Sequence, residues 1–252
     1  MTLTTELTHY LKTFRLPCMR ESYTDIAEEA LKESLSYEQF LHRLFQEEYE
    51  ARTQNKVARF LIQSKLPLEK NLDAFDLKRI PPKIRQQIPK LLEGCFLDNA
   101  ENLLVFGSPG TGKTHLLCAV AQELIRKERR ILFSKCDLLV QELLVAKKNL
   151  ELGKALKKLA KYDAILIDDI GYVQQSREEM EVLFTLFADR YERASIMISS
   201  NLPFSKWDTL FKSEMTAAAA IDRLVHHSII LELNISSFRM DAAKAKGGTA
   251  TN

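Results

Sequence analysis

The chain contains the octapeptide Gly107-Ser108-Pro109-Gly110-Thr111-Gly112-Lys113-Thr114. It fits the phosphate-binding loop G-x-x-x-x-G-K-[ST], in which glycines let backbone N–H groups curl around a phosphate without Cβ clashes. An apolar run at 103–106 precedes the loop, and an apolar helical pattern over 116–124 follows it. The motif requires a strand before it and a helix after it, and both are predicted here. The alternative, a chance glycine-rich turn, would need neither. We predict that Lys113 reaches the β- and γ-phosphates of a nucleotide and that Thr114 ligates Mg²⁺.

Two carboxylates follow a second buried strand. The run 164–167 is apolar, and Asp168 and Asp169 come directly after it. Asp168 is placed to hold Mg²⁺, directly or through water, and Asp169 to orient or deprotonate an attacking water. A helix cap is the alternative role, for which Asp169 is the better placed of the two. The phosphate loop favours the catalytic interpretation.

A polar tip also ends the apolar run at 195–199. Asn201 stands there and could hydrogen-bond a γ-phosphate or its water, if its strand lies beside the one that ends at Asp168. A turn asparagine is equally compatible with the spacing, because Pro203 follows. The guanine-reading sequence N-K-x-D is absent from the chain, so ATP is preferred to GTP.

The order of apolar segments predicts two domains, 1–67 and 68–252. The first is helical, with a capping box at Ser36 and Gln39, and would serve self-association or partner contacts. The proline-containing stretch 68–89 is interpreted as a linker with short helical pieces. Beyond it, short apolar strands alternate with helices, which predicts a parallel sheet buried on both faces. The five expected strands are 103–106, 131–133, 164–167, 196–199 and 229–233.

Composition limits the remaining options. The 252 residues are 46% hydrophobic and carry 36 basic against 34 acidic side chains, so the net charge of +2 gives no overall signature of nucleic-acid binding. The four cysteines form no CxxC pair, which argues against a disulfide framework or a zinc site. The first residues lack a signal-peptide pattern, and no apolar run approaches the ~20 residues of a membrane span. We expect a soluble protein of the cytoplasm with no membrane partner.

The motifs resemble those of the AAA+ ATPases of the initiator and helicase-loader group. The similarity rests on the phosphate loop continued by His115-Leu116, on 167–171 and on 199–203. Within that group the chain is most similar to the IstB-like transposition helper ATPases, relatives of the helicase loader DnaC, over nearly its whole length. The segments 16–19 and 35–41 are similar to the helical domain of that family. The resemblance implies an α/β fold: an AAA+ P-loop NTPase core with a five-stranded parallel sheet, preceded by a small all-α N-terminal domain.

The resemblance also assigns roles to residues. It places Lys113 and Thr114 in Walker A, Asp168 and Asp169 in Walker B, and Asn201 at sensor 1. The segment 221–224 resembles the box that supplies an arginine finger, Arg223, to a neighbouring subunit, and 237–239 resembles sensor 2 with Arg239. A surface ion pair is the alternative for both arginines. The implied ATP-binding residues are Gly107, Ser108, Pro109, Gly110, Thr111, Gly112, Lys113, Thr114 and His115.

The chain departs from the family pattern in two respects. Asp169 stands where many AAA+ proteins have Glu, which could slow or reposition the activation of water. After Leu233 too little chain remains for the usual helical lid, which puts the role of Arg239 in doubt.

A lysine stripe marks the expected DNA contact. The segment 153–162 is predicted to be an amphipathic helix with leucines on one side and lysines on the other. The alternative is a solvated helix face with no binding role. The resemblance favours DNA contact, because initiator-type ATPases carry a DNA-contacting insertion between the second and third strands, where this stripe falls. Lysines alone imply phosphate contacts with little sequence preference. The expected DNA-binding residues are Lys147, Lys148, Lys154, Lys157, Lys158 and Lys161.

Together these features predict an ATP- and Mg²⁺-dependent DNA-binding ATPase that helps a transposase capture target DNA. Its expected partners are duplex DNA, the cognate transposase and further copies of the chain, with ATP at the subunit interfaces. A DnaC-like helicase loader is the nearest alternative. A small-molecule P-loop kinase and a structural clamp, in which hydrolysis times release, are alternatives of other classes.

Overall fold

The computed structural model describes residues 2–171, 176–202, 207, 224–238 and 240–241. Its contacts divide the chain into two compact units, Met1–Arg59 (unit 1) and Phe60–Asn252 (unit 2), each of which is described by itself. The boundary falls inside helix α3, Tyr37–Ser64. The domain boundary predicted after residue 67 lies just beyond the end of this helix.

Unit 1 is helical in its described part. It contains α1 (Leu3–Thr13), α2 (Pro17–Lys32) and the first part of α3. The predicted capping box is confirmed, because the Ser36 N–H donates to Gln39 Oε1 at 2.9 Å and the Gln39 N–H donates to Ser36 Oγ at 3.2 Å. A small apolar core holds the helices together and consists of Leu11, Met19, Ile26 and Leu44.

Unit 2 is built on a parallel sheet, as the sequence predicts. Its strands follow the spatial order β2-β3-β4-β1-β5, so β4 separates β1 from β3. Since the carboxyl ends of parallel strands lie at one edge of a sheet, the residues that follow β1, β3 and β4 meet there. The strands are β1 (Asn102–Phe106), β2 (Ile131–Lys135), β3 (Ala164–Ile170), β4 (Ser195–Ser200) and β5 (Ser228–Glu232).

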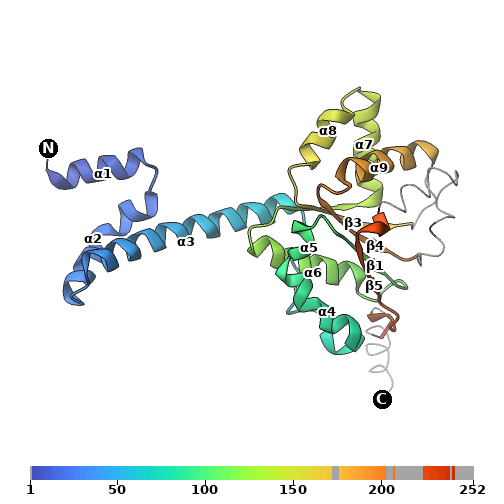
Figure 1. Cartoon of the computed structure of the whole chain (residues 1–252), viewed down its shortest axis with the longest axis horizontal. Helices are drawn as coiled ribbons and strands as arrows, with labels where there is room; N and C mark the ends of the chain where they lie inside the picture. Colours follow the sequence, from blue (N-terminus) through green and yellow to red (C-terminus); the bar gives the residue numbers. More distant parts are fainter. Residues whose placement is uncertain (1, 172–175, 203–206, 208–223, 239, 242–252) are drawn as a thin grey trace, which may run out of the picture. The chain divides into compact units, whose positions relative to one another are not determined.

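Helices cover both faces of this sheet (Figure 1). On one face lies α6 (Lys113–Arg126), and on the other lie α7 (Cys136–Lys148), α8 (Leu152–Leu159) and α9 (Arg177–Arg190). This division follows from the right-handed crossovers of parallel strands. The connection from β1 to β2 crosses the sheet in one direction, whereas those from β2 to β3 and from β3 to β4 cross it in the opposite direction. Their helices therefore pack on opposite faces. Among the described helices, none is both long and apolar enough to cross a membrane.

The proline-rich stretch is more regular than its sequence suggests. A 3-10 turn covers Leu77–Arg79, α4 covers Pro82–Glu93, and the short α5 covers Cys95–Asp98. The short helical pieces predicted for this stretch are present, but residues 82–89 belong to the regular helix α4 and not to a linker. Pro82 occupies the first turn of α4, where its missing N–H costs nothing. Pro89 lies inside the helix, and the buried face of α4, which includes Ile84, compensates for the backbone hydrogen bond that this proline cannot make.

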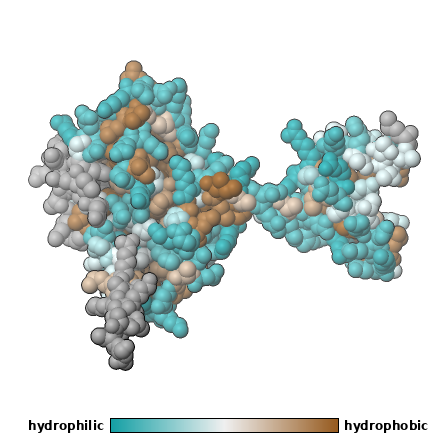
Figure 2. Space-filling model, turned by 180° about the vertical axis from the view of Figure 1, so that it is seen from behind, coloured by the Kyte–Doolittle hydropathy of each residue, from teal (hydrophilic) through white to brown (hydrophobic). Residues whose placement is uncertain are grey.

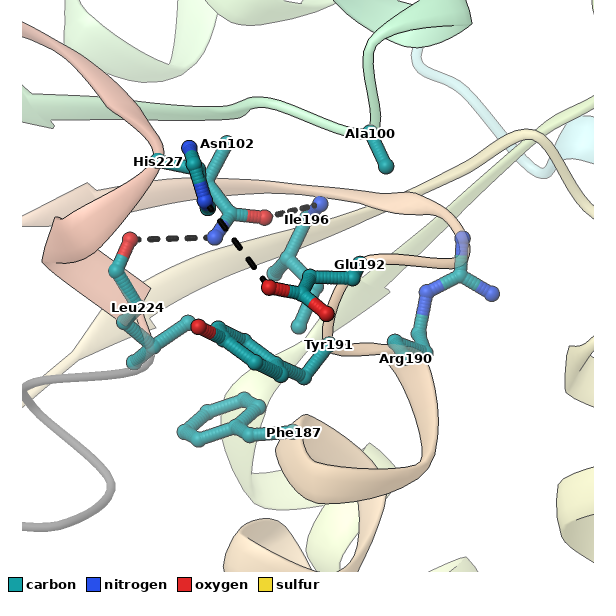
Figure 3. A pocket seen from close by; sticks show the side chains of 9 residues that line it. All are labelled: Ala100, Asn102, Phe187, Arg190, Tyr191, Glu192, Ile196, Leu224 and His227. Carbon is teal, nitrogen blue, oxygen red and sulfur yellow. Dashed lines mark hydrogen bonds and ion pairs between the residues drawn. The ribbon is translucent and has the colours of Figure 1, made fainter.

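Two buried polar side chains fasten the sheet at the edge opposite the phosphate loop. Asn102 Nδ2 donates to Leu224 O at 3.0 Å, and its Oδ1 accepts from the Ile196 N–H at 2.8 Å (Figure 3). The hollow beside Asn102 has a volume of about 10 Å³, which is room for about one water and not for a nucleotide.

Arg190, at the end of α9, is the second of these side chains and is 2% exposed. Its guanidinium donates to the carbonyls of Leu159 (3.1 Å), Tyr162 (2.9 Å), Asp163 (3.2 Å) and Ser195 (3.0 Å). Burial lowers the pKa of Arg190 to about 10, so the group stays charged at neutral pH. The side chain thus joins the end of α8 and the start of β4 to α9.

Arg190→Met is expected to lower the free energy of unfolding by roughly 3 kcal/mol, because it leaves buried carbonyls without donors. Chemical denaturation measures this loss. The matched control is Arg126→Met, since Arg126 forms an exposed ion pair with Glu123 that is worth at most about 1 kcal/mol. Equal effects of the two substitutions would contradict the role given to Arg190.

Candidate nucleotide-binding site

The phosphate loop connects β1 to α6 and leaves room only for glycine at its bends. Gly107 has a φ of 156°, and a Cβ there would lie 2.6 Å from Leu233 O. Gly110 has a φ of 83°, and a Cβ there would overlap the Ser237 hydroxyl. Both glycines are therefore required by the positive φ and by close approach of the chain after β5. The loop forms a cradle whose backbone can approach a phosphate.

Lys113 points its ammonium group into this cradle. The residue is 4% exposed, and its Nζ donates to Ser108 O at 2.9 Å and to Asn201 Oδ1 at 2.6 Å. Asn201 directly follows β4, the neighbour of β1, so the sheet order brings the two predicted residues together. Oxygen acceptors thus surround the ammonium, and phosphate oxygens are acceptors of the same kind.

Thr114 and Asp168 are in direct contact. Thr114 Oγ1 donates to Asp168 Oδ1 at 2.7 Å, and Asp168 is 5% exposed at the end of β3. Ser199 Oγ donates to the same carboxylate oxygen at 2.5 Å. A hydroxyl and a carboxylate side by side form the oxygen donor set that Mg²⁺ prefers, so these two residues fit the metal.

Asp169 differs from Asp168 in exposure and in backbone. Its φ of 60° lies in the left-handed region, and its N–H donates to Ser199 Oγ at 2.8 Å. The register of β3 against β4 shifts between Ile167 and Ile170, as in a β-bulge, which turns the carboxylate toward the cleft. Strained backbone of this kind is frequent at functional sites.

The Asp169 carboxylate faces the predicted site and does not cap the next helix. Its Oδ1 accepts from Asn201 Nδ2 at 3.4 Å. Helix α9 is instead capped by Ser176, whose side chain accepts from the Glu179 N–H while Glu179 bonds back to Ser176. The capping alternative is therefore wrong for α9.

A cleft of about 500 Å³ opens over the loop, within the usual size range of ligand sites. Sequence reasoning missed the aromatic residues that line it. Phe75 packs its ring 5.0 Å from that of His115, and Phe238 lies 6.3 Å from Phe75. The His115 imidazole also hydrogen-bonds Asn71 O at 2.8 Å. Apolar rings therefore form one wall of the cleft, and Lys113 and Asp169 lie on its polar part.

The segment after β5 is held over the loop by Arg79. The Phe238 N–H donates to Gly110 O at 2.9 Å, and the guanidinium of Arg79 lies 3.8 Å from the centre of the Phe238 ring. Arg79 Nη2 also donates to Ser236 Oγ at 2.8 Å and to Asp241 Oδ2 at 2.5 Å. This short C-terminal turn closes one side of the cleft. Arg239 and Arg223 lie outside the described residues, and their roles remain predictions.

The lysine stripe lies away from the cleft, on the α7–α8 hairpin. The predicted amphipathic helix is present as α8, Leu152–Leu159, and is shorter than expected. Lys147 pairs with Glu181 at 2.9 Å, and Lys154 pairs with Glu151 at 2.8 Å. These exposed pairs are weak and can exchange partners. The remaining predicted lysines, Lys148, Lys157, Lys158 and Lys161, are exposed.

Curated relatives of this chain belong to insertion sequences. A putative insertion sequence ATP-binding protein of Sinorhizobium fredii is 37% identical over 245 residues, which are 95% of this chain and 82% of the relative. The insertion sequence IS21 putative ATP-binding protein of Pseudomonas aeruginosa is 34% identical over 246 residues, 98% and 92% of the two chains.

Solved structures share the fold at low identity. The DnaC helicase loader matches 67% of this chain and 97% of its own, with a TM-score of 0.56 and 19% identity. AMPPCP-bound DnaA from Aquifex aeolicus matches 73% of this chain and 56% of its own, with a TM-score of 0.56 and 22% identity. These neighbours share the α/β fold of this chain, an AAA+ P-loop core with a five-stranded parallel sheet. The profile of the family "IstB-like ATP binding protein" matches residues 9–246, and the chain belongs to this family.

Proposed function

We propose that this protein is a Mg²⁺-dependent ATPase that captures duplex DNA for a transposase. The observation that carries the ATPase proposal is the convergence of Lys113, Asp169 and Asn201 on one cleft, with Thr114 bonded to Asp168 beside it. A phosphate cradle, a metal-binding pair and a carboxylate that faces the cleft are the parts that phosphoryl transfer to water requires.

In this proposal each residue has a separate task. Lys113 and the loop N–H groups neutralise and fix the phosphates, and Thr114 and Asp168 hold Mg²⁺, which supplies further charge neutralisation on the phosphate oxygens. Asp169 orients a water molecule and accepts its proton, and Asn201 positions that water or the terminal phosphate. Arg223 of a neighbouring subunit and Arg239 in cis would add positive charge, as the family resemblance implies.

The DNA and transposase parts of the proposal rest on two kinds of support. The relatives are putative ATP-binding proteins of insertion sequences, from which we infer a transposase as the partner and DNA as the target. The α7–α8 hairpin presents exposed lysines that suit phosphate contacts. We propose that the protein acts in the cytoplasm as a homo-oligomer, with ATP at the subunit interfaces, and binds duplex DNA with little sequence preference.

A helicase loader is the second candidate, because the fold of the DnaC helicase loader matches 67% of this chain. Both candidates predict ATP hydrolysis stimulated by DNA. They differ in the partner, since a loader would bind a replicative helicase and a transposition helper would bind a transposase. The family match leaves the small-molecule kinase without support.

The test is ATP hydrolysis with and without unrelated duplexes. Duplex DNA should stimulate turnover, and the double variant Lys157→Ala/Lys158→Ala should lose stimulation and bind all sequences more weakly. The slope of log affinity against log salt should fall by about 0.9 for each phosphate contact removed. Fluorescence anisotropy across a salt series measures that slope.

The matched control replaces two exposed lysines elsewhere on unit 2, Lys90 and Lys127, with alanine. Turnover without DNA should be preserved in both double variants. An unchanged salt slope in the Lys157/Lys158 variant would show that the lysine stripe is a solvated helix face that does not contact DNA.

A further inference from the structure

Leu150, at the turn between α7 and α8, is among the most exposed apolar side chains of the described chain, at 95%. It follows the end of α7, and its N–H donates to Lys147 O at 3.1 Å. The Glu151 N–H then donates to Ala146 O at 2.7 Å, which completes a Schellman-type helix end. The turn is therefore well formed, and its most prominent side chain is a leucine directed to solvent.

The fold does not account for this leucine. Its φ of 57° is left-handed, a conformation for which glycine or asparagine is normally selected at a helix end. Among the other described non-glycine residues with positive φ, none carries a large apolar side chain; they are Arg15, Ser34, Lys65, Ala100, Glu128, Asp169 and Glu192. Leu150 combines backbone strain with exposure of an isobutyl group, and no burial compensates for either.

Exposed lysines flank Leu150, and the acidic neighbour Glu151 pairs with one of them, Lys154. Lys147 and Lys148 precede it in the last turn of α7, and Lys154 follows in the first turn of α8. Figure 2 shows hydrophobic surface reaching the outer end of unit 2, where α7 joins α8, with hydrophilic surface around it. Gly153 lies in the first turn of α8, and a Cβ added there would meet nothing within 4 Å. Because alanine would favour the helix, this glycine serves something other than internal packing.

We propose that Leu150 is a wedge that inserts between base pairs of the duplex held by the flanking lysines. Architectural proteins use apolar side chains in this way, opening a base step while basic residues hold the backbone. The absence of a side chain at Gly153 lets a sugar-phosphate strand approach the start of α8. This inference rests on the proposed DNA binding and adds an unstacking contact to it.

A protein partner suits this surface less well. The centres of protein interfaces are depleted of lysine, and one leucine within a rim of lysines buries too little apolar area to hold a partner. Duplex DNA satisfies both features, since phosphates pair with the lysines and a base step receives the leucine. Because pyrimidine–purine steps open most easily, the wedge gives a modest preference for TA steps that phosphate contacts cannot give.

The experiment uses the full chain with ATP and duplexes that carry 2-aminopurine at a central TA step, whose fluorescence rises when the base unstacks. Wild type is expected to raise the fluorescence severalfold. Leu150→Gly should abolish that rise and lower affinity about tenfold, the scale of one stacking contact. Its salt slope should equal that of wild type, because no phosphate contact is lost. Leu150→Met should retain the fluorescence rise.

Controls separate the wedge from damage to the hairpin. Glycine suits the left-handed turn, so Leu150→Gly should not lower the unfolding temperature. Leu138→Asn removes a leucine of α7 that is 50% exposed and should leave fluorescence and affinity unchanged. Wild type that binds with a normal salt slope but without a fluorescence rise would overturn the wedge and leave the proposed function standing. An undiminished fluorescence rise with Leu150→Gly would likewise overturn the wedge. Wild type that binds no duplex at all would overturn the proposed function and the wedge together.

Discussion

Lys113→Ala is expected to lower the affinity for ATP by about 30-fold or more. Loss of a buried, hydrogen-bonded charge costs about 2–5 kcal/mol in a binding site, where every 1.4 kcal/mol is tenfold. The buried ammonium sits between Ser108 O and Asn201 Oδ1, so its removal leaves those acceptors unpaired and the phosphates without their cation. Titration of a fluorescent ATP analogue into the purified variant measures the loss.

Lys127→Ala is the matched control, because Lys127 follows the other end of α6 and is exposed. It should bind ATP as wild type does. Thermal unfolding without nucleotide shows whether Lys113→Ala has kept its fold. A folded Lys113→Ala protein with wild-type affinity would refute the assignment of the phosphate loop.

The core of unit 2 could be predicted because its signals are local. Each strand is a short apolar run, and the loop motif fixes which strand precedes which helix. The parallel sheet predicts that Asn201 and the phosphate loop lie at the same edge, and the observed strand order, with β4 beside β1, brings Asn201 to Lys113. The capping box at Ser36 was likewise predictable from residues three apart.

The other features of the site and of α4 depend on contacts between residues that are far apart in the sequence. Phe75 lies in a stretch that reads as a linker, and only the folded chain brings its ring against His115. Ser199 follows the apolar pattern of a strand, yet its hydroxyl joins Asp168 to the Asp169 N–H. Pro89 reads as a helix breaker, whereas packing of α4 keeps it inside a helix. Tertiary burial outweighs local preference in each case.

The left-handed backbone at Asp169 was also unpredictable, and it bears on the absence of the glutamate that many AAA+ proteins have there. Aspartate and asparagine tolerate a positive φ because a short polar side chain can hydrogen-bond locally. The carboxylate of Asp169 is already exposed to the cleft and within reach of Asn201 Nδ2. A substitution to asparagine therefore keeps the backbone, the size and the approximate polarity, and removes only the ability to take up a proton.

Asp169→Asn is expected to bind ATP like wild type and to hydrolyse it about 10²–10⁴-fold more slowly, the usual contribution of a general base. Single-turnover measurement of phosphate release separates this loss from a loss of binding. Asp137→Asn is the control, because it neutralises an exposed carboxylate near the end of β2. If hydrolysis drives release, DNA complexes of Asp169→Asn should also dissociate more slowly in ATP than those of wild type. Turnover equal to that of wild type would remove Asp169 from catalysis, and its strained backbone would then need another explanation.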